Sequence, residues 1–364
     1  MSTIEPTEYK PDVALPPGLT ILEKVREKGM TQTELAERMG RPLNKVNEIV
    51  KGKRAITPET AQELEFVLGF PAHFWLKLEA DYQLAQRRLD TESHLREESK
   101  SLNLFPMREM IKLGWLEKGR DDIQTTLNLL KFFGIASFAN LKNPTVMGAV
   151  FRKSQIKEAC NYALAAWLRN GEIEAEAIKT SNFDGSGLVA NINKMRSLSL
   201  LQPDKFIVEL TEICLNHGIA VVLVPHLPKS YASGASYWVG DKAVIQLSLR
   251  FRTNDHFWFS FFHELGHILL HGKNSTFIDD FAKSDDDKEL QANNFSGKCL
   301  IPPQHYDRLK RTNFHQASVV TKFADEIGIA PGIVVGRLQH DGLIGYNILN
   351  SLKIKFIWAH EQSD

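Results

Sequence analysis

Cysteine is scarce in this chain of 364 residues. The only cysteines are Cys160, Cys214 and Cys299, and their odd number and wide spacing argue against a disulfide framework. An excess of charge of one sign is also missing, because 44 basic residues balance 44 acidic ones. Any affinity for a polyanion must therefore come from a local patch and not from the whole molecule.

Long apolar runs are missing as well. The apolar segment 257–270 is too short and too polar to span a bilayer, and the chain has no secretory signal pattern. Internal repeats and low-complexity tracts are also absent. These absences predict a cytoplasmic protein of two or three domains without a membrane partner.

The most specific pattern in the chain is His-Glu-x-x-His, formed by His263, Glu264 and His267. Histidines four residues apart lie on one helical face and can bind one zinc ion, and the glutamate beside them is suited to act as general base. The segment 257–270 is apolar nearly all round, which predicts a buried helix ending at Gly272. Buried histidines and glutamates are costly unless they are paired or bind a metal. The alternative is a core helix whose polar groups find other partners.

A catalytic zinc site needs a third protein ligand and an open position for water. Glu289 follows the acidic run 285–287 in a stretch that predicts a second helix, with negative charge at its N-terminus. On position alone, Glu289 is either this ligand or one more solvated acid of the run. His271 lies one turn beyond His267 and is another candidate, although a histidine there also suits the helix dipole. Four residues are candidates for the donor that a developing oxyanion needs: Tyr237, His315, Arg337 and His340.

The region 203–346 resembles the ImmA/IrrE-type metallopeptidase domain. The resemblance rests on three segments: 257–267, 289–295 and 299–302. It implies a gluzincin-like zinc metallo-endopeptidase in which His263, His267 and Glu289 bind one Zn²⁺ per chain, and Glu264 is then the catalytic base. Manganese or iron would fit the same donors. Because such peptidases cleave transcription repressors, the implied substrate is a partner repressor or this chain itself.

Short strands surround the predicted zinc helix. Residues 242–249 alternate apolar and polar side chains like a half-buried strand, and residues 220–224 form an apolar run like a buried one. These two segments predict a small sheet packed on the zinc helix. A free edge of that sheet could hold an extended peptide by strand addition. Residues 352–358 alternate in the same way and predict a terminal strand.

The N-terminal region 19–80 contains five short helical patterns. Thr31 and Glu34 form a capping box at the start of the second helix, and Gly40 follows as a tight turn. Thr57 is a typical N-cap for the fourth helix, with proline at the first helical position. A helix, a glycine turn and a second helix are the plan of a helix-turn-helix reader of DNA.

Local charge supports that interpretation. Between Arg38 and Arg54 there are six basic residues and one acid, Glu48. Phosphate contacts need such a positive patch, and asparagine and lysine can also contact base edges in the major groove. The expected DNA contacts are Gln32, Thr33, Arg41, Asn44, Lys45, Asn47, Lys51, Lys53 and Arg54. The alternative is a plain helical bundle with a solvated basic face.

Residues 40–61 and 69–76 resemble the HigA-type antitoxin branch of the Xre helix-turn-helix family. The resemblance implies binding of a double-stranded DNA operator as a homodimer at paired half-sites. It also implies a cognate toxin as a further partner.

The whole chain therefore predicts an α+β, mostly helical fold. It begins with a five-helix domain of the Xre type, continues through a helical middle region, and ends in a zincin-like domain whose small sheet packs on the His-Glu-x-x-His helix. The expected division is a tail at 1–18, the helix-turn-helix domain at 19–80, a linking helix at 81–104, the middle region at 105–200 and the metallopeptidase domain at 201–364.

Two functions fit this plan. One is a DNA-binding regulator with an active zinc endopeptidase that cleaves itself or a partner repressor in stress, prophage or toxin-antitoxin control. The other is an antitoxin-like repressor whose zinc domain senses or docks a partner and cleaves nothing. The two differ in whether Glu264 is needed for function.

Overall fold

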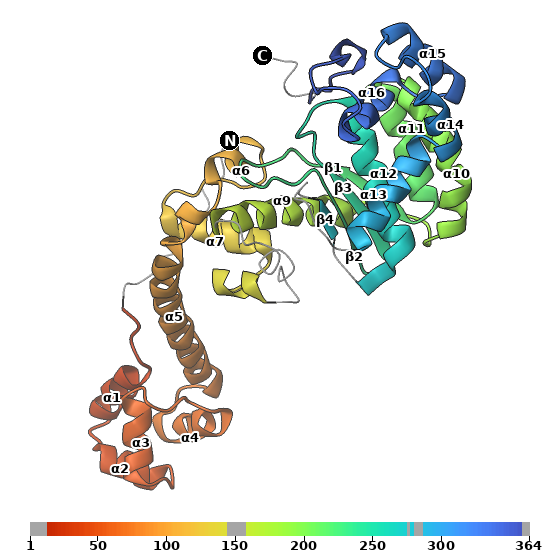
Figure 1. Cartoon of the computed structure of the whole chain (residues 1–364). Coiled ribbons are helices and arrows are strands. Elements are labelled where there is room, and N and C mark those ends of the chain that lie inside the picture. The colour runs from red at the N-terminus through yellow and green to blue at the C-terminus, as the bar shows by residue number, and fades with distance from the viewer. Residues whose placement is uncertain (1–12, 144–157, 275–276, 280–286, 359–364) are drawn as a thin grey trace, which may run out of the picture. The chain divides into compact units, whose positions relative to one another are not determined.

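The computed structural model describes residues 13–143, 158–274, 277–279 and 287–358. They belong to two compact units. The first holds the residues up to 100 together with 121–126, and the second holds 101–120 and everything from 127 onward. The described chain is mostly helical with one small sheet, as predicted (Figure 1). No helix among the described residues has the length and apolar character needed to cross a membrane.

The first unit contains the five predicted helices: α1 Gly18–Glu27, α2 Gln32–Arg38, α3 Leu43–Val50, α4 Pro58–Leu68 and α5 Ala72–Ser99. The capping box is present, since Thr31 N–H donates to Glu34 at 2.8 Å and Glu34 N–H donates to the Thr31 hydroxyl at 3.2 Å. Gly40 turns the chain between α2 and α3 with a φ of +65°, a conformation that glycine adopts at little cost. Thr57 caps α4 by accepting a hydrogen bond from Thr60 N–H.

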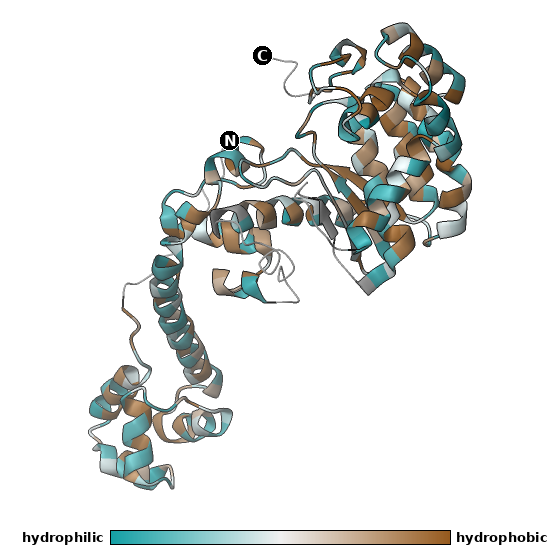
Figure 2. Cartoon of the chain, in the orientation of Figure 1, coloured by the Kyte–Doolittle hydropathy of each residue, from teal (hydrophilic) through white to brown (hydrophobic). Residues whose placement is uncertain are grey.

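The fifth helix and the linking helix are a single element. α5 runs for 28 residues without a break at position 80, a length of about 42 Å. Trp75 near its start is fully buried in the core of the first unit, and its indole N–H donates to the Phe70 carbonyl at 3.2 Å. Most of α5 is coloured as hydrophilic in Figure 2. The remaining domain boundaries expected from the sequence stay a prediction.

The part of the chain before the sheet is helical, as expected. Its elements are η1 Leu102–Leu104, α6 Met107–Lys112, α7 Asp122–Phe133, η2 Phe138–Lys142, α9 Glu158–Ala177, α10 Gly185–Ser197, η3 Leu198–Leu200 and α11 Pro203–Asn216. Of these, α9 and α11 contact the sheet directly.

The sheet has four strands in the order β1-β3-β2-β4. The strands are β1 Ile219–Leu223, β2 Gly234–Val239, β3 Lys242–Leu247 and β4 Phe277–Asp279. β1 pairs parallel to β3, whereas β2 pairs antiparallel to both β3 and β4. The two predicted strands are β1 and β3, and β2 and β4 were not anticipated.

Both faces of β3 are buried, although its alternating pattern suggested one solvated face. Ala243, Ile245 and Leu247 belong to the main core, whereas Gln246 points to the other face. There the Gln246 amide donates to the Trp167 carbonyl of α9 at 2.7 Å and accepts from the Tyr237 hydroxyl at 2.9 Å. Polar residues in a strand therefore do not indicate a solvent-exposed face when a neighbouring helix supplies their hydrogen-bond partners.

The zinc-motif helix is α12 Asn254–His271, and it is buried along most of its length. Trp258, Phe261 and Phe262 are among the largest fully buried side chains of the protein. α12 ends at Gly272, which has a φ of +66°, as the sequence predicted.

Four helices follow α12 and complete the second unit: α13 Asp287–Leu300, α14 Pro303–Leu309, α15 Ala317–Ile327 and α16 Pro331–His340. α12 contacts α13, α16 and strands β2 and β3. The core of this unit therefore lies around α12.

The terminal strand predicted at 352–358 is wrong. Residues Asn350–Leu352 form a short 3-10 helix, η5, and the following segment forms an isolated antiparallel bridge between Lys355 and Thr253. Phe356 is buried in the core, and its N–H donates to the Arg252 carbonyl at 2.8 Å. Phe356 therefore packs beside α12 without a partner strand along the segment, whereas Ile354 and Ile357 are exposed.

Candidate metal centre and DNA-binding surface

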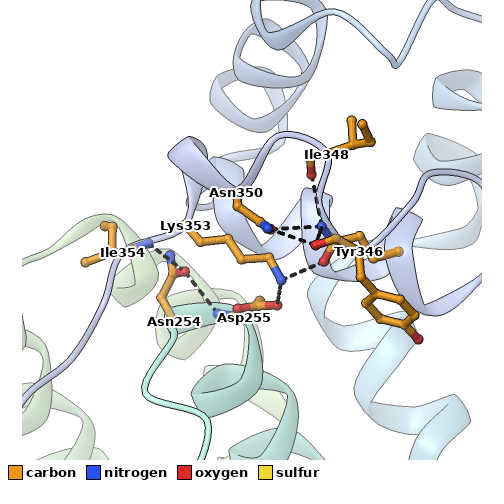
Figure 3. Close-up of polar contacts among 8 residues, drawn as sticks. Asn254, Asp255, Tyr346, Ile348, Asn350, Lys353 and Ile354 are labelled. Atoms are coloured by element: carbon orange, nitrogen blue, oxygen red, sulfur yellow. Dashed lines mark hydrogen bonds and ion pairs between the residues drawn. The ribbon is translucent and has the colours of Figure 1, made fainter.

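The N-terminus of α12 is fixed by a polar network with the C-terminal segment (Figure 3). The Asn254 side-chain oxygen accepts from Ile354 N–H at 3.1 Å, and the Asn254 N–H donates to the Ile354 carbonyl at 2.9 Å. The Lys353 ammonium donates to Asp255 at 2.6 Å and to Gln339 at 2.7 Å. The Lys353 contacts are charge-assisted, and together with the two Asn254 hydrogen bonds they hold the helix that carries the motif in place.

His263 and His267 project from one face of α12, one turn apart, as the spacing predicted. Their exposed fractions are 2% and 1%. The two Nε2 atoms lie 3.0 Å from each other. Two ring nitrogens at that separation can share one metal ion.

Glu289 reaches the two histidines from α13. Its Oε2 atom lies 3.2 Å from His263 Nε2 and 3.4 Å from His267 Nε2. Ligand atoms that lie about 2.0–2.2 Å from a tetrahedral zinc are about 3.3–3.6 Å from one another. The three donor atoms therefore fit the edges of such a tetrahedron closely. Among the described residues, these three form the group of His, Cys, Asp and Glu side chains able to hold a metal ion.

Small residues allow α13 to approach α12. A Cβ atom added at Gly266 would lie 3.0 Å from the Phe295 ring and 3.4 Å from the Ala292 Cα atom. A larger side chain at position 266 would push α13 away, and with it Glu289. The acidic run expected before α13 falls partly on residues 285 and 286, which lie outside the described residues.

The protonation states suit a metal site. Burial by itself would raise the pKa of Glu289, but hydrogen bonds with His263 and His267 outweigh it and hold the pKa far below its ordinary value. Burial lowers the pKa of His267, which favours the neutral imidazole. His263 Nδ1 lies 3.0 Å from the Asn293 side-chain oxygen, so an Nδ1–H donor there leaves Nε2 as the acceptor that faces the site.

Glu264 is fully buried beside strand β2. A Cβ atom added at Gly234 would lie 2.6 Å from Glu264 Oε1, so the backbone of β2 passes directly against this carboxylate. Only glycine leaves room for Glu264 at that point. The sheet and α12 thus fix the glutamate next to the histidine pair.

His271 is not part of the three-residue group. Its Nε2 atom lies 3.2 Å from the Lys288 carbonyl, a backbone contact at the start of α13. This placement agrees with its interpretation as a C-terminal histidine of the helix and not as a ligand.

The four oxyanion candidates lie in different surroundings. Tyr237 points to the α9 side of the sheet, where it donates to Gln246 and where burial raises its pKa, so it is the wrong choice. His315 is exposed. Arg337 donates to Asp341 at 2.9 Å, and His340 lies 3.0 Å from the same carboxyl group. The His340 ring also stacks on Phe259, one turn before His263.

Most of the predicted DNA contacts lie on an open surface of α2, α3 and the loop after α3. The exposed ones are Thr33, Asn44, Lys51, Lys53 and Arg54, and the partly exposed ones are Gln32, Lys45 and Asn47. Glu48 lies 3.2 Å from Lys45 and 3.8 Å from Arg54, so it neutralises part of the positive charge.

Arg41 is an exception to this expectation. It precedes α3 instead of lying on it, and its guanidinium pairs with Glu59 at 3.2 Å and with Glu63. Only 16% of its side chain is exposed. The sequence pattern did not reveal that two glutamates one turn apart on α4 would bind this arginine, so Arg41 joins α4 to the turn and does not face outward.

Comparison with known proteins agrees with this architecture. Residues 214–339 match the family described as the IrrE N-terminal-like domain, a peptidase family, and residues 21–75 match a helix-turn-helix family. The chain is 35% identical over 99 residues to virulence-associated protein A of Dichelobacter nodosus. The matched region covers 26% of this chain and 91% of that protein. The chain belongs to the Xre-type helix-turn-helix family and carries an IrrE-like peptidase domain.

A solved structure of a HigA-family addiction module antidote protein from Coxiella burnetii is also similar. It is 28% identical and covers 23% of this chain and 94% of that chain, with a TM-score of 0.22.

Three residues of the IrrE-like domain were missed from the sequence. Asn293 lies one turn after Glu289 on the same helical face, and that spacing was the available signal. Gly234 carried no signal because the strand that contains it was not anticipated. Asp255 looked like an ordinary first-turn acid of α12, and only the fold brings Lys353 to it.

Proposed function

We propose that this protein is a DNA-binding transcription regulator whose IrrE-like domain is a zinc-dependent endopeptidase. The observation that carries the proposal is the set of three donor atoms, 3.0 to 3.4 Å apart, with a buried glutamate next to them in the chain. His263, His267 and Glu289 would hold one Zn²⁺, and among the described residues no fourth His, Cys, Asp or Glu joins this group, which would leave a position for water. A structural zinc site would instead be closed by a fourth protein ligand.

The roles of the residues follow from their positions. Bound zinc supplies Lewis acidity and lowers the pKa of a water molecule. Glu264 accepts a proton from the attacking water and delivers it to the leaving amine of the cleaved peptide bond. Asn293 orients the His263 ring. Gly234 keeps the backbone of β2 clear of the Glu264 carboxylate.

The substrate is a protein segment in extended form, either from a partner repressor or from this chain. Strand β2 lies against Glu264, and its outer neighbour is β4, a strand of three residues at the edge of the sheet. Strand addition at that edge would bring an extended peptide toward the metal ligands.

The helix-turn-helix domain is proposed to bind an operator as a homodimer, with the nine candidate contacts on α2, α3 and the following loop, except Arg41. A regulator of this kind acts where the chromosome is, in the cytoplasm. Its control of stress, prophage or toxin-antitoxin genes, with a cognate toxin as a further partner, belongs to the same proposal.

The test compares the wild type with Glu264→Gln. Both proteins are purified, their zinc content is measured, and each is incubated with DNA selected from a random duplex pool before intact-mass analysis. One zinc per chain in both, with fragments from the wild type alone, is the expected result. Absence of metal in the wild type would overturn the zinc site.

The alternative is an antitoxin-like repressor whose zinc domain cleaves nothing. The complete helix-turn-helix domain favours it, because that domain has its own core. It predicts zinc and equal DNA binding in both proteins, without fragments from either and without loss of repression in Glu264→Gln.

A further inference from the structure

The first turn of α3 presents an amide and an apolar side chain to solvent. Helix α3 buries Val46, Ile49 and Val50 in the core of the first unit. With 3.6 residues per turn, Asn44 lies on the side of the helix opposite to these three residues. Asn44 is exposed, and Leu43, the first residue of α3, is 40% exposed. In a helix-turn-helix reader the N-terminal residues of the second helix contact base edges in the major groove, so these two side chains are placed to read the sequence.

The basic side chains near this turn are paired with acids. Lys45 is the only basic residue of α3, and its Nζ atom lies 3.2 Å from Glu48. Arg54 lies 3.8 Å from the same carboxylate, and Arg41 is bound to α4. Exposed ion pairs are weak, but the Glu48 carboxylate keeps a negative charge on this face of the helix. Guanine is read by arginine or lysine through its two acceptors, O6 and N7, and a neighbouring carboxylate repels both.

Two exposed lysines lie at the other end of α3. Lys51 directly follows the last residue of the helix, and Lys53 lies in the loop after it. A lysine is suited to bind phosphate oxygens, and such contacts fix the position of the protein on the duplex but carry no sequence information. The two lysines therefore account for affinity, and base recognition is left to the first turn of α3.

We propose that the first turn of α3 reads neighbouring A·T base pairs in each operator half-site. The Asn44 amide donates to N7 of an adenine and accepts from its N6 amino group, a pairing that the two acceptors of guanine do not allow. Leu43 has no polar side-chain atom and contacts the methyl group of a thymine in the next base pair. Asn47, partly exposed one turn after Leu43, adds a second amide to this face. The inference rests on the proposed DNA-binding function and is independent of the peptidase.

The test begins with selection from a random duplex pool by the full-length Glu264→Gln protein, which removes the proposed self-cleavage from the experiment. Neighbouring A·T pairs are expected at a fixed position of each selected half-site. Asn44→Arg should change the selected adenine to guanine, because arginine matches the O6 and N7 acceptors. Gln86→Ala removes an exposed amide on α5 and is the control that should keep the original preference.

Base analogues in the selected duplex then identify the atoms that are read. Replacing the adenine by 7-deazaadenine removes N7 and should weaken binding about fivefold, but not in the variant Asn44→Ala. Replacing the thymine by uracil removes one methyl group and should weaken binding about three- to fivefold, but not in Leu43→Ala. Both substitutions lie at solvent-accessible positions, and thermal unfolding of each variant checks that the domain is intact.

Different outcomes decide the inference and the function on which it rests. A guanine at the position that depends on Asn44, or analogue penalties that persist in Asn44→Ala and Leu43→Ala, would overturn the inference and leave operator binding intact. Equal binding of all duplexes would also overturn it and would leave a non-specific DNA-binding domain. Absence of binding to any duplex, even at low salt where phosphate contacts are strongest, would overturn the DNA-binding function itself and the inference with it.

Discussion

The candidate metal centre and the DNA-binding surface place their polar residues in opposite environments. His263 and His267 are 2% and 1% exposed, whereas Asn44, Lys51 and Lys53 stand in solvent. A buried polar group must be satisfied by a specific partner at a specific distance. An exposed one is satisfied by water, so its position in the fold constrains its role far less.

This difference explains why the sequence predicts individual contacts in the metal centre but only a general surface in the helix-turn-helix domain. The His-Glu-x-x-His motif on α12 identifies the side chains whose ring nitrogens must lie close together to bind one metal ion. The basic residues around α3 define only a charged face, and that pattern did not reveal the ion pairs of Arg41 with Glu59 and Glu63 of α4. Substitutions in the buried centre should therefore change metal affinity or rate strongly, whereas substitutions on the exposed surface should change DNA affinity by small steps.

The largest effect is expected for His267→Ala. Removing one of three ligands leaves an incomplete site, and metal affinity should fall by more than the 10- to 100-fold typical of an outer-shell change. Zinc affinity is measured by competition with a chromophoric chelator, with Glu264→Gln as the control that keeps all three ligands. Unchanged affinity in His267→Ala would show that the buried histidines are core residues.

Gly234→Ala should impair the catalytic base Glu264 without affecting metal binding. Its Cβ atom would lie 2.6 Å from Glu264 Oε1, so the carboxylate must move. A displacement of about 1 Å in a catalytic group can cost on the order of 100-fold in rate. We expect kcat to fall by that order while zinc binding stays within twofold. Ala235→Gly, at the next position of β2, is a control for strand stability, and a loss of zinc in Gly234→Ala would contradict the assignment.

The predictable part of the site was the part set by local geometry. Four-residue spacing on a helix places His263 and His267 together in any fold. The resemblance, more than the spacing, pointed to Glu289, because the contact between α12 and α13 depends on small residues such as Gly266 that carry no visible pattern. The predicted strand at 352–358 failed for a similar reason. Its alternation was real, but the fold gives it a single bridge and lets Phe356 fill the core beside α12.

Asn293→Ala should have an intermediate effect. The Asn293 oxygen lies 3.0 Å from His263 Nδ1 and fixes the ring orientation. Loss of such a contact typically lowers metal affinity by about 10- to 100-fold. The neighbouring Asn294→Ala is the matched control, because Asn294 is exposed one position further along α13. Equal affinities for the two variants would mean that His263 needs no support from α13.

Arg41→Ala should act on stability more than on DNA recognition. A hydrogen bond with Glu63 raises the pKa of Arg41 and, with Glu59, ties the turn to α4. Removing a partly buried, hydrogen-bonded partner costs about 1–3 kcal/mol. Chemical denaturation measures the change in the free energy of unfolding, and hydrogen exchange measures the local stability of α3 and α4. Arg38→Ala, at an exposed position, is the control. If Arg41→Ala leaves exchange unchanged but weakens DNA binding, the original assignment as a DNA contact is restored.

The smallest effect is expected for Lys53→Ala, on the exposed side of the comparison. Lys53 stands in solvent in the loop after α3, so its loss should leave the fold unchanged. A lysine that neutralises one phosphate adds about one to the slope of log affinity against log salt, and it does so equally for all sequences. Binding to a selected duplex and to a scrambled one is therefore measured over a salt series, with Lys77→Ala on α5 as control. A loss that is larger for the selected duplex would make Lys53 a base contact, and the exposed surface would then hold residue-level information that its sequence pattern concealed.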